Sequence, residues 1–435
     1  MSPLVLIGLV GVLLWSLVSH RFERWGVAGP AALIVLGAAT VAADLPAFEG
    51  AIDAEWSEKV VEVVLAILLF VDATAVSGKG IFGGEGRATL RLILIGLPLS
   101  LILAVVAGVL VMPNSVFVIL VIACVVMPTD FAPAARILRL RHVPPRVRQI
   151  LNVESGYNDG LVSPLFGMAL ATSVVITGVL RAESGQDDGM LDTEVEHFVS
   201  AFLTAVPATA VAIAVGVAFG ALVGWAVRVL HARGFADDGG VRFVMLLLPL
   251  IAYGVAILIP VVHANGFVAA FVAGVAYRVA RTRRLPERTI PHAELILVEE
   301  TGLLASNLVW FMLGGTAVVA VLDGIDPAVV LFAVLALTLL RMVPVWLSLM
   351  GGSVGRRDRV LIGALGPRGT ASIVFGLLAF NALPTNSGEA DLVLDVMVVT
   401  VVLSVLLHGV VAPAVLRRLD RGGALSTAGG DRSTR

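Results

Sequence analysis

The sequence predicts an all-α polytopic membrane protein with about thirteen transmembrane helices. Of its 435 residues, 58% are hydrophobic and only 14% are charged, whereas a soluble protein carries roughly 25% charged residues. The apolar segments are long enough to cross a bilayer as helices, and too long for the strands of a membrane β-barrel. The first segment lacks a basic start and a small-residue cleavage site, so we expect a retained span and not a cleaved signal.

The apolar segments and the loops between them support the same topology. The segments fall near residues 3–19, 27–43, 60–76, 92–112, 114–133, 149–180, 198–227, 243–260, 264–279, 295–322, 328–350, 360–380 and 392–416. Acidic loops near residues 44–58 and 183–196 follow even-numbered segments, whereas arginine-rich loops follow odd-numbered ones, such as the ninth loop with Arg278 and Arg281. Because short cytoplasmic loops collect basic residues, we expect an external amino terminus and a cytoplasmic carboxyl terminus in the cell membrane.

Two of the predicted spans are interrupted at corresponding places. The fifth contains Pro128 and Pro133 on either side of Asp130, and the twelfth contains Gly366-Pro367-Arg368-Gly369. Proline removes a backbone donor, and the freed backbone groups are tolerated at mid-membrane only where they line a cavity or bind something. Paired interruptions are typical of transporters built from inverted repeats, here spans four to six and eleven to thirteen. The alternative is two unrelated proline kinks.

A polar stretch lies inside the apolar segment at 149–180. It reads Glu154-Ser155-Gly156-Tyr157-Asn158-Asp159-Gly160. Helical spacing places Ser155 and Asp159 on one face and Glu154 and Asn158 on the neighbouring face. Hydrocarbon cannot solvate carboxylates, so ionisable groups at this depth are functional candidates. We expect a cation site with a supporting face beside it; the alternative is a pair of salt-bridged structural carboxylates.

These residues together resemble the motifs of the monovalent cation:proton antiporters of the sodium/proton exchanger type, specifically NhaP-like proteins. The matching stretches are the break at Pro128-Thr129-Asp130, the signature at residues 154–160, the G-x-R-G break at 366–369, the last-helix stretch at 404–409, the acidic third-helix stretch at 68–73, and Arg341 with Pro344. The resemblance covers about residues 60–416. One departure is Phe131, where the family usually has proline.

The resemblance implies an ion site around one carboxylate. Asp159 would carry either the cation or the proton, with Ser155 and the Thr129 carbonyl as neutral oxygen ligands and Asp72 as an ancillary carboxylate. Electrogenic relatives have a second aspartate where this chain has Asn158. A single exchangeable charge is therefore expected, and with it an electroneutral exchange.

The resemblance also implies supporting contacts. Glu154 would pair with Arg368, because neither charge tolerates burial alone. Asp130 would cap freed amides of a half-helix. His408 is expected to hydrogen-bond a carbonyl or to pack without carrying protons, and Asn265, with the neighbouring His263, to be a turn residue. The partner of Arg341 stays open, and the single Cys124 gives no disulfide framework or metal cluster.

The domain organisation follows from the same resemblance. Scaffold and dimerisation helices would occupy residues 1–76 and 241–322, and a linking helix 198–230. The two core repeats would occupy 90–180 and 328–418, with their broken helices crossing in the core. Residues 419–435 would form a short, disordered cytoplasmic tail. A homodimer is implied by the resemblance only.

The function implied is secondary active transport and not an enzymatic reaction. A monovalent cation, Na⁺ with Li⁺ or K⁺ as alternatives, would be exchanged for H⁺ across the lipid bilayer by elevator-like alternating access. No cofactor, nucleotide or nucleic acid is expected, because the sequence contains no Walker motif or dinucleotide fingerprint. The competing hypotheses are a gated cation channel, which would need a filter of carbonyls or rings of charge, a K⁺-selective exchanger, and an intramembrane enzyme.

Overall fold

The computed structural model describes residues 3–25, 27–41, 48, 55–76, 84–131, 134, 143–182, 190–259, 264–285, 289–384 and 388–412. In these ranges the chain forms helices joined by turns, and no strand occurs among them. The predicted all-α class is therefore confirmed. The tail at 419–435, Pro133 and His263 lie outside the described residues.

The helices follow the predicted apolar segments closely. In chain order they are α1 (Pro3–Trp25), α2 (Gly29–Val41), α4 (Glu55–Ala75), α5 (Gly86–Arg91), the π-helical η1 (Leu92–Gly96), α6 (Leu97–Val111), α7 (Val116–Val126), α9 (Pro145–Ala182), α10 (Met190–Ala232), α11 (Asp238–Ile257), α12 (Gly266–Thr282), α13 (His292–Asp323), α14 (Pro327–Leu337), α15 (Leu339–Ser348), α16 (Arg356–Ala364), α17 (Thr370–Ala382), α18 (Gly388–Ser404) and the π-helical η3 (Val405–Val411). In the described part of the chain, eight helical segments are long and apolar enough to cross a membrane, and α2, α7 and α17 are shorter apolar helices. Thirteen as the number of spans stays a prediction.

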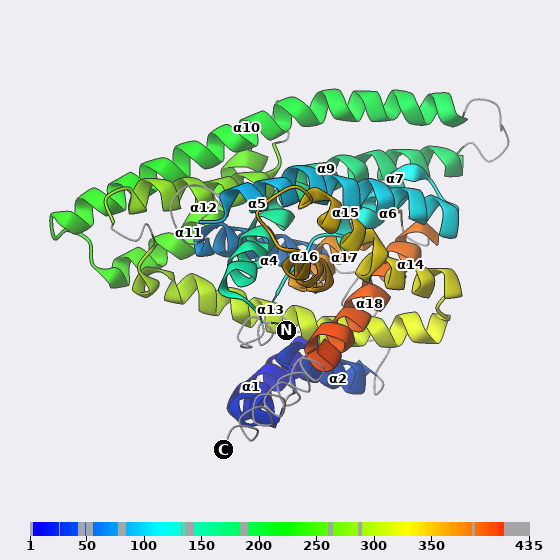
Figure 1. Cartoon of the computed structure of the whole chain (residues 1–435), viewed down its shortest axis with the longest axis horizontal. Helices are drawn as coiled ribbons and strands as arrows, with labels where there is room; N and C mark the ends of the chain where they lie inside the picture. The colour runs from blue at the N-terminus through cyan, green and yellow to red at the C-terminus, as the bar shows by residue number, and fades with distance from the viewer. Residues whose placement is uncertain are drawn as a thin grey trace, which may run out of the picture.

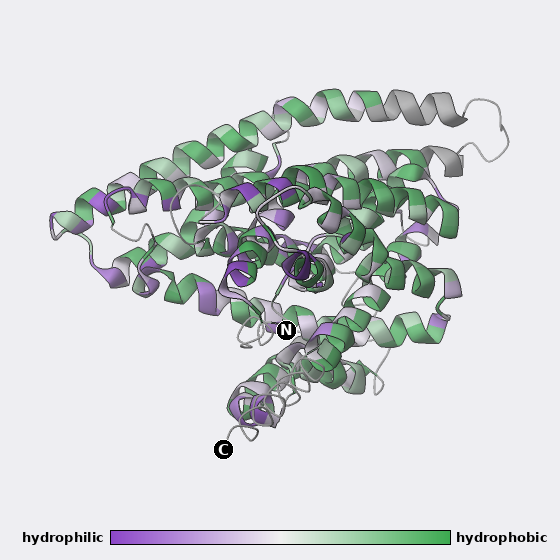
Figure 2. Ribbon diagram, in the orientation of Figure 1, coloured by the Kyte–Doolittle hydropathy of each residue, from purple (hydrophilic) through white to green (hydrophobic). Residues whose placement is uncertain are grey.

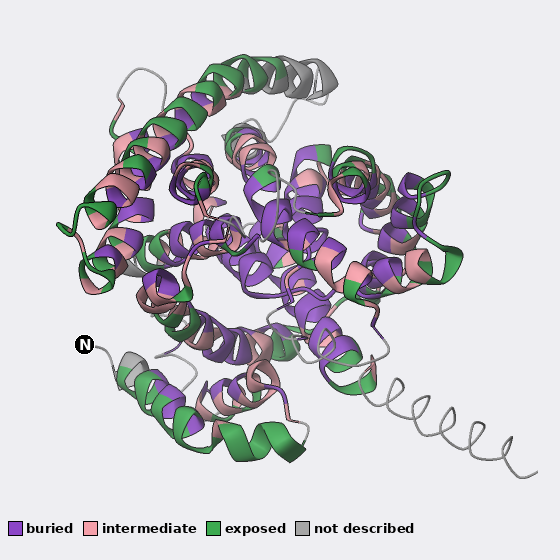
Figure 3. Cartoon of the chain, turned by 60° about the vertical axis from the view of Figure 1, so that its left-hand side comes forward, coloured by how far each residue is buried: buried purple, intermediate pink, exposed green. Residues whose placement is uncertain are grey.

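The outer surface of the helices is apolar, as a membrane requires. Hydrophobic residues cover most of the ribbon (Figure 2), and large exposed ones such as Leu17 on α1 and Leu203 and Leu222 on α10 point outward. Helix α10 runs along one edge of the molecule, with α1 and α2 at the other (Figure 1). Burial concentrates between these edges (Figure 3). A lipid-facing shell around a packed centre is the arrangement expected of a polytopic bundle.

Small residues let several helices approach closely. Along α10, Gly216 and Gly220 lie directly against the backbone of Ala269 and Ala273 on α12. In the same way, Gly37 on α2 meets the backbone of α13 at Phe311. Such contacts are typical of membrane helix pairs, where packing and not hydrophobicity drives association. They make α10 with α12, and α2 with α13, tightly packed pairs.

The two predicted interruptions are present and touch each other. Helix α7 ends at Val126, and residues 127–131 are not helical. Residues 365–369 separate α16 from α17. The amide of Asp130 in the first break donates a hydrogen bond to the carbonyl of Pro367 in the second, at 2.9 Å. The broken helices therefore cross in the core, as predicted.

A further break, not predicted, divides the eleventh apolar segment. Helix α14 ends at Leu337 and α15 begins at Leu339, and Thr338 between them leaves the helical conformation with φ −121° and ψ −96°. The change of direction at this point sets the path of α15, the helix that carries Arg341. A single threonine in an apolar run gives no sequence signal for such a break.

Candidate ion-binding site

Helix α9 carries the polar stretch at 154–160 through the middle of the bundle. All of its residues are buried except Ser155, which is half-buried. Successive residues of an α-helix are rotated by about 100°. Ser155 and Asp159 therefore share one side of α9, and Glu154 and Asn158 share the adjacent side, as the spacing predicts.

The side of α9 that carries Glu154 and Asn158 is held by two other elements. The Asn158 Nδ2 donates a hydrogen bond of 2.9 Å to Thr129 Oγ1 in the first break. The two Glu154 carboxylate oxygens accept hydrogen bonds of 3.0 Å and 3.1 Å from Nη1 and Nη2 of Arg341 on α15. Both charged side chains are only 4% exposed. A bidentate arginine–carboxylate pair of this kind orients both groups and neutralises the charge of Glu154.

The predicted pair of Glu154 and Arg368 is wrong. Arg368 is fully buried, and its guanidinium donates to the backbone carbonyls of Val126, Gly366 and Ala336. Two of these carbonyls stand at the edges of the breaks, where the helical hydrogen-bonding pattern is interrupted. A guanidinium has five N–H donors, so one arginine can satisfy several carbonyls at once. The sequence could not show this, because the acceptors are backbone atoms.

Asp130 links the first break to the half-helix that follows the second. Its carboxylate accepts a hydrogen bond of 2.8 Å from the amide of Thr370, the first residue of α17. Gly369 packs directly against the Asp130 side chain, so a side chain at that position would collide with it. A carboxylate at a helix N-terminus satisfies a free amide and interacts favourably with the helix dipole. The predicted capping role of Asp130 takes this form.

Asp159 is buried within electrostatic range of two other carboxylates. It is 3% exposed and interacts electrostatically with Asp130, Asp72 and Arg368. Asp72 is brought close because its carbonyl packs on Gly156, where an added Cβ would come within 2.9 Å of that oxygen. Helix α4, the first break and α9 thus each bring a carboxylate into this region. Among the described residues, no cluster of His, Cys, Asp and Glu suited to a resident metal ion occurs.

The sequence model of the transmembrane sodium/hydrogen exchanger family matches residues 5–418. The chain belongs to the sodium/hydrogen exchanger family. Two solved structures of the sodium proton antiporter MjNhaP1 from Methanocaldococcus jannaschii share its fold. The structure at pH 8 matches with a TM-score of 0.72 and 16% identity, over 93% of this chain and 98% of that one. The electron-microscopy structure matches with a TM-score of 0.65 and 17% identity, over 96% and 98%. No curated protein sequence gives a significant match.

Family membership makes this exchanger a multi-pass membrane transporter of cations and protons and not an enzyme. Glu154 is neutralised by Arg341 and Asn158 has no charge, which leaves Asp159 as the carboxylate of residues 154–160 that forms no ion pair with an arginine in the described part of the chain.

His408 of this exchanger lies between two backbone carbonyls, and a neutral imidazole, which has one N–H donor, can donate a hydrogen bond to one of them, as predicted. Its ring nitrogens lie 3.1 Å from the carbonyl oxygens of Ser404 and Ala364. The Ser404 hydroxyl accepts a hydrogen bond of 2.7 Å from the amide of Arg368. The last-helix motif thus ties η3 and α18 to the second break.

Two residues assigned to a basic loop are instead buried in a helix of the exchanger. Arg278 and Arg281 lie on α12 and are 2% and 6% exposed. Arg281 forms an ion pair with Glu294 of α13, which also accepts a hydrogen bond of 3.1 Å from Tyr277. The predicted segment 264–279 already contained Tyr277 and Arg278, and continuing its helical repeat past residue 279 would have placed Arg281 on α12 as well.

Asn265 of the exchanger is more than the turn residue that we predicted. Its Oδ1 accepts hydrogen bonds from the amides of Phe267 and Val268 and so caps α12. Its Nδ2 donates to the carbonyl of Ser163 on α9, at 3.3 Å. One turn separates Ser163 from Asp159.

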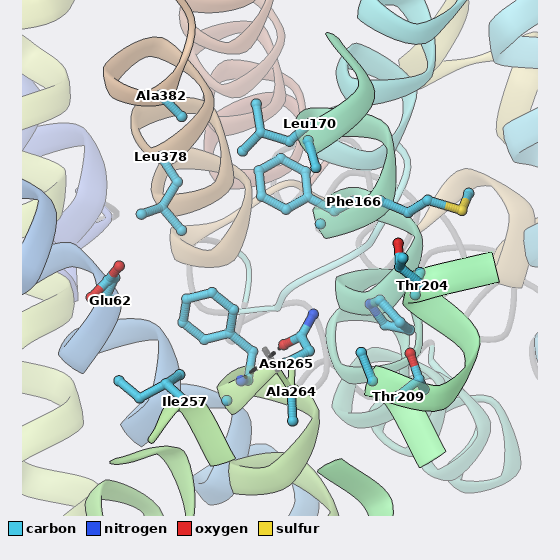
Figure 4. A pocket seen from close by; sticks show the side chains of 18 of the residues that line it. Glu62, Phe166, Leu170, Thr204, Thr209, Ile257, Ala264, Asn265, Leu378 and Ala382 are labelled. Carbon is cyan, nitrogen blue, oxygen red and sulfur yellow. Dashed lines mark hydrogen bonds between the residues drawn. The ribbon is translucent and has the colours of Figure 1, made fainter. Parts of the chain in front are cut away.

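A cavity of about 720 Å³ opens beside this contact. One wall consists of α9 from Pro164 to Ala171 and the end of α17, and the others belong to α4, α10, α11 and α12 (Figure 4). Glu58 and Glu62 line it on the side of the acidic loop at 44–58. Pro164 follows Asp159 by five residues, about 7.5 Å along the helix. The cavity thus lies on the acidic side of the molecule, and its nearest lining residue on α9 is between one and two turns from Asp159.

Proposed function

We propose that this exchanger moves one Na⁺ in exchange for one H⁺, with Asp159 as the group that holds each in turn. The pairing of Glu154 with Arg341 carries the proposal, because it removes the other carboxylate of the signature from exchange. Only one charge then remains on α9 between residues 154 and 160. A single carboxylate binds either one cation or one proton, so the two ions compete for the same place.

The neighbouring oxygens are suited to a small, hard cation. Ser155 shares the side of α9 with Asp159, and Thr129 is fixed beside it by Asn158. The Asn158 Oδ1 is buried without a hydrogen-bond partner in the described part of the chain, which leaves an acceptor for a water of the cation. Carboxylate, hydroxyl and carbonyl oxygens are the ligands that such cations take. Asp72 would complete the set from α4.

The cavity supports alternating access. It lies between α9 and α17 on one side and α4, α10, α11 and α12 on the other. In this proposal residues 90–180 and 328–418 form the moving core. The helices of 1–76 and 241–322 form the scaffold and the homodimer contact, with 198–230 linking the two. The positive-inside rule places the acidic side, and with it the cavity, outside the cell membrane, with the amino terminus outside and the carboxyl terminus in the cytoplasm.

Transport by reconstituted protein tests the proposal. Proteoliposomes with an internal pH dye receive an outward Na⁺ gradient, and Asp159→Asn should abolish the pH change while the protein stays folded. Asp326→Asn is the matched control, because Asp326 caps α14 at the surface and asparagine caps equally well. Exchange by Asp159→Asn near the wild-type rate would refute the carrier role. Competition among Na⁺, Li⁺ and K⁺ in the same assay decides the cation.

A further inference from the structure

Arg278 joins three elements at a point close to the site. It is 2% exposed on α12. Its Nη1 donates a hydrogen bond of 2.6 Å to the carbonyl of Val76, which directly follows α4. Its Nη2 donates a hydrogen bond of 3.0 Å to the hydroxyl of Tyr157 on α9. The guanidinium plane is therefore set by the end of α4 and holds the signature helix.

The contact with Tyr157 is one of several contacts that α12 makes with α9. The Tyr157 ring packs edge-on against Phe271 of α12, with centroids 5.5 Å apart and planes at 83°. The Phe271 ring also lies directly on Gly160, where an added side chain would collide with it. Residues 157 and 160 bracket Asn158 and Asp159. Thus α12 holds both ends of the segment that carries the ion-binding groups.

The helical repeat places Tyr157 on a different side of α9 from the carboxylate of Asp159. Tyr157 is rotated from Asp159 by two residues, about 200° along the helix. It therefore leaves α9 on nearly the opposite side from Asp159 and does not face the ion. Any effect of Arg278 on transport must act through the position of α9.

We propose that Arg278 is a positioning residue for exchange, whose hydrogen bond to Tyr157 stabilises the conformation with the cavity on the acidic side. This inference rests on the proposed function, in which α9 moves relative to α4 and α12. Arg278 is anchored to Val76, so it cannot follow α9 when that helix shifts. The bond to Tyr157 must then break in every transport cycle, and its loss favours the opposite conformation.

The neighbouring polar cluster on α12 provides a natural comparison. The Tyr277 hydroxyl also bonds to a buried charged partner, but it donates, and the partner is Glu294 on α13. Both α12 and α13 belong to the proposed scaffold. Removing the Tyr277 hydroxyl therefore perturbs a buried network of similar chemistry without touching α9.

Cysteine labelling in proteoliposomes tests the inference directly. Ala171 of α9 is exposed and lines the cavity, and the single native cysteine, Cys124, is buried, so Ala171→Cys provides a reporter for a membrane-impermeant thiol reagent. In this background Tyr157→Phe should lower the labelling rate by about tenfold, since the lost hydrogen bond is to a charged group. The apparent KM for Na⁺ on the cavity side should rise in parallel. Tyr277→Phe should change neither quantity.

Arg278→Lys serves as the second variant. It keeps the positive charge but loses the planar guanidinium, whose two Nη atoms donate to Val76 and Tyr157. It should reproduce the effect of Tyr157→Phe, and the double variant should go no further than either single one. Unchanged labelling and KM in a folded, transporting Tyr157→Phe protein would overturn the inference. An equal change in Tyr277→Phe would also overturn it, by showing a general loss of packing. Absence of Na⁺/H⁺ exchange in the wild-type protein would instead count against the proposed function.

Discussion

At the scale of single residues, the site shows how burial selects partners. Glu154 and Arg341 are each 4% exposed and are joined by two hydrogen bonds, whereas the Arg368 guanidinium donates its hydrogen bonds to backbone carbonyls. Asn158 uses its amide to hold Thr129. The first of these contacts neutralises Glu154, and the proposed function therefore assigns ion exchange to Asp159.

Breaking the pair of Glu154 and Arg341 should be strongly destabilising. Either Glu154→Ala or Arg341→Ala leaves a buried charge unpaired and should cost about 3–5 kcal/mol. Thermal unfolding in detergent, read as a double-mutant cycle, should show that the double variant recovers part of this loss. Glu154→Ala combined with Arg368→Ala should instead be additive. Coupling to Arg368 and not to Arg341 would contradict the pairing.

Asn158→Ala should weaken cation binding without unfolding the protein. The change frees Thr129, whose oxygen is then no longer held toward the site, and we expect a fall in apparent Na⁺ affinity of about tenfold, as for the loss of one buried hydrogen bond. The measurement is the Na⁺ dependence of exchange in proteoliposomes. Thr129→Val, which removes the other partner, should give a similar loss. A normal affinity in both variants would show that the bond does not organise the site.

At the scale of elements, the two breaks function as one unit. Asp130 in the first break accepts a hydrogen bond from the first amide of α17, and its own amide donates to Pro367 in the second. The crossing therefore depends on a close approach between backbones. Gly369 permits that approach by leaving room for the Asp130 carboxylate.

Gly369→Ala should disturb the crossing. The added methyl group would collide with the Asp130 side chain, and we expect a loss of about 1–3 kcal/mol in unfolding free energy, with slower exchange. Gly254→Ala on α11 is the control, because nothing lies within 4 Å of the added atom and alanine is the better helix former. Equal stability of the two variants would mean that the breaks are not in close contact.

At the scale of the whole molecule, the single exchangeable charge that we propose would determine how transport responds to pH and voltage. As pH falls, protons occupy Asp159, and the apparent cation affinity should drop by up to tenfold per pH unit once the proton outcompetes the cation. At high pH, exchange should slow for want of protons. The profile of rate against pH should thus be bell-shaped.

Membrane potential should neither drive nor slow the exchange, because each cycle of the proposed one-for-one exchange moves one charge in each direction. The test uses proteoliposomes clamped with valinomycin and K⁺, with Na⁺ as the transported ion. Clear acceleration by an imposed voltage would show a second charge in motion. Asp72 and Asp130, both within electrostatic range of Asp159, would then be the groups to replace next.

Local pattern was sufficient for much of this protein. Apolar segment length predicted the helices, proline and glycine predicted both breaks, and four-residue spacing predicted which groups share a side of α9. These features depend on the backbone and on neighbours within one or two turns. For that reason the all-α class and the central position of residues 154–160 followed from the sequence.

Only the tertiary structure decided which charges pair and which helices hold the site. The sequence predicted Arg368 as the partner of Glu154, but in the structure Arg341 pairs with Glu154, and Arg368 donates to backbone carbonyls. The burial of Arg278 against Tyr157 likewise depends on how α12 crosses α9, 121 positions away along the chain. Long-range contacts between polar groups have no fixed spacing, because they arise from the relative placement of whole helices.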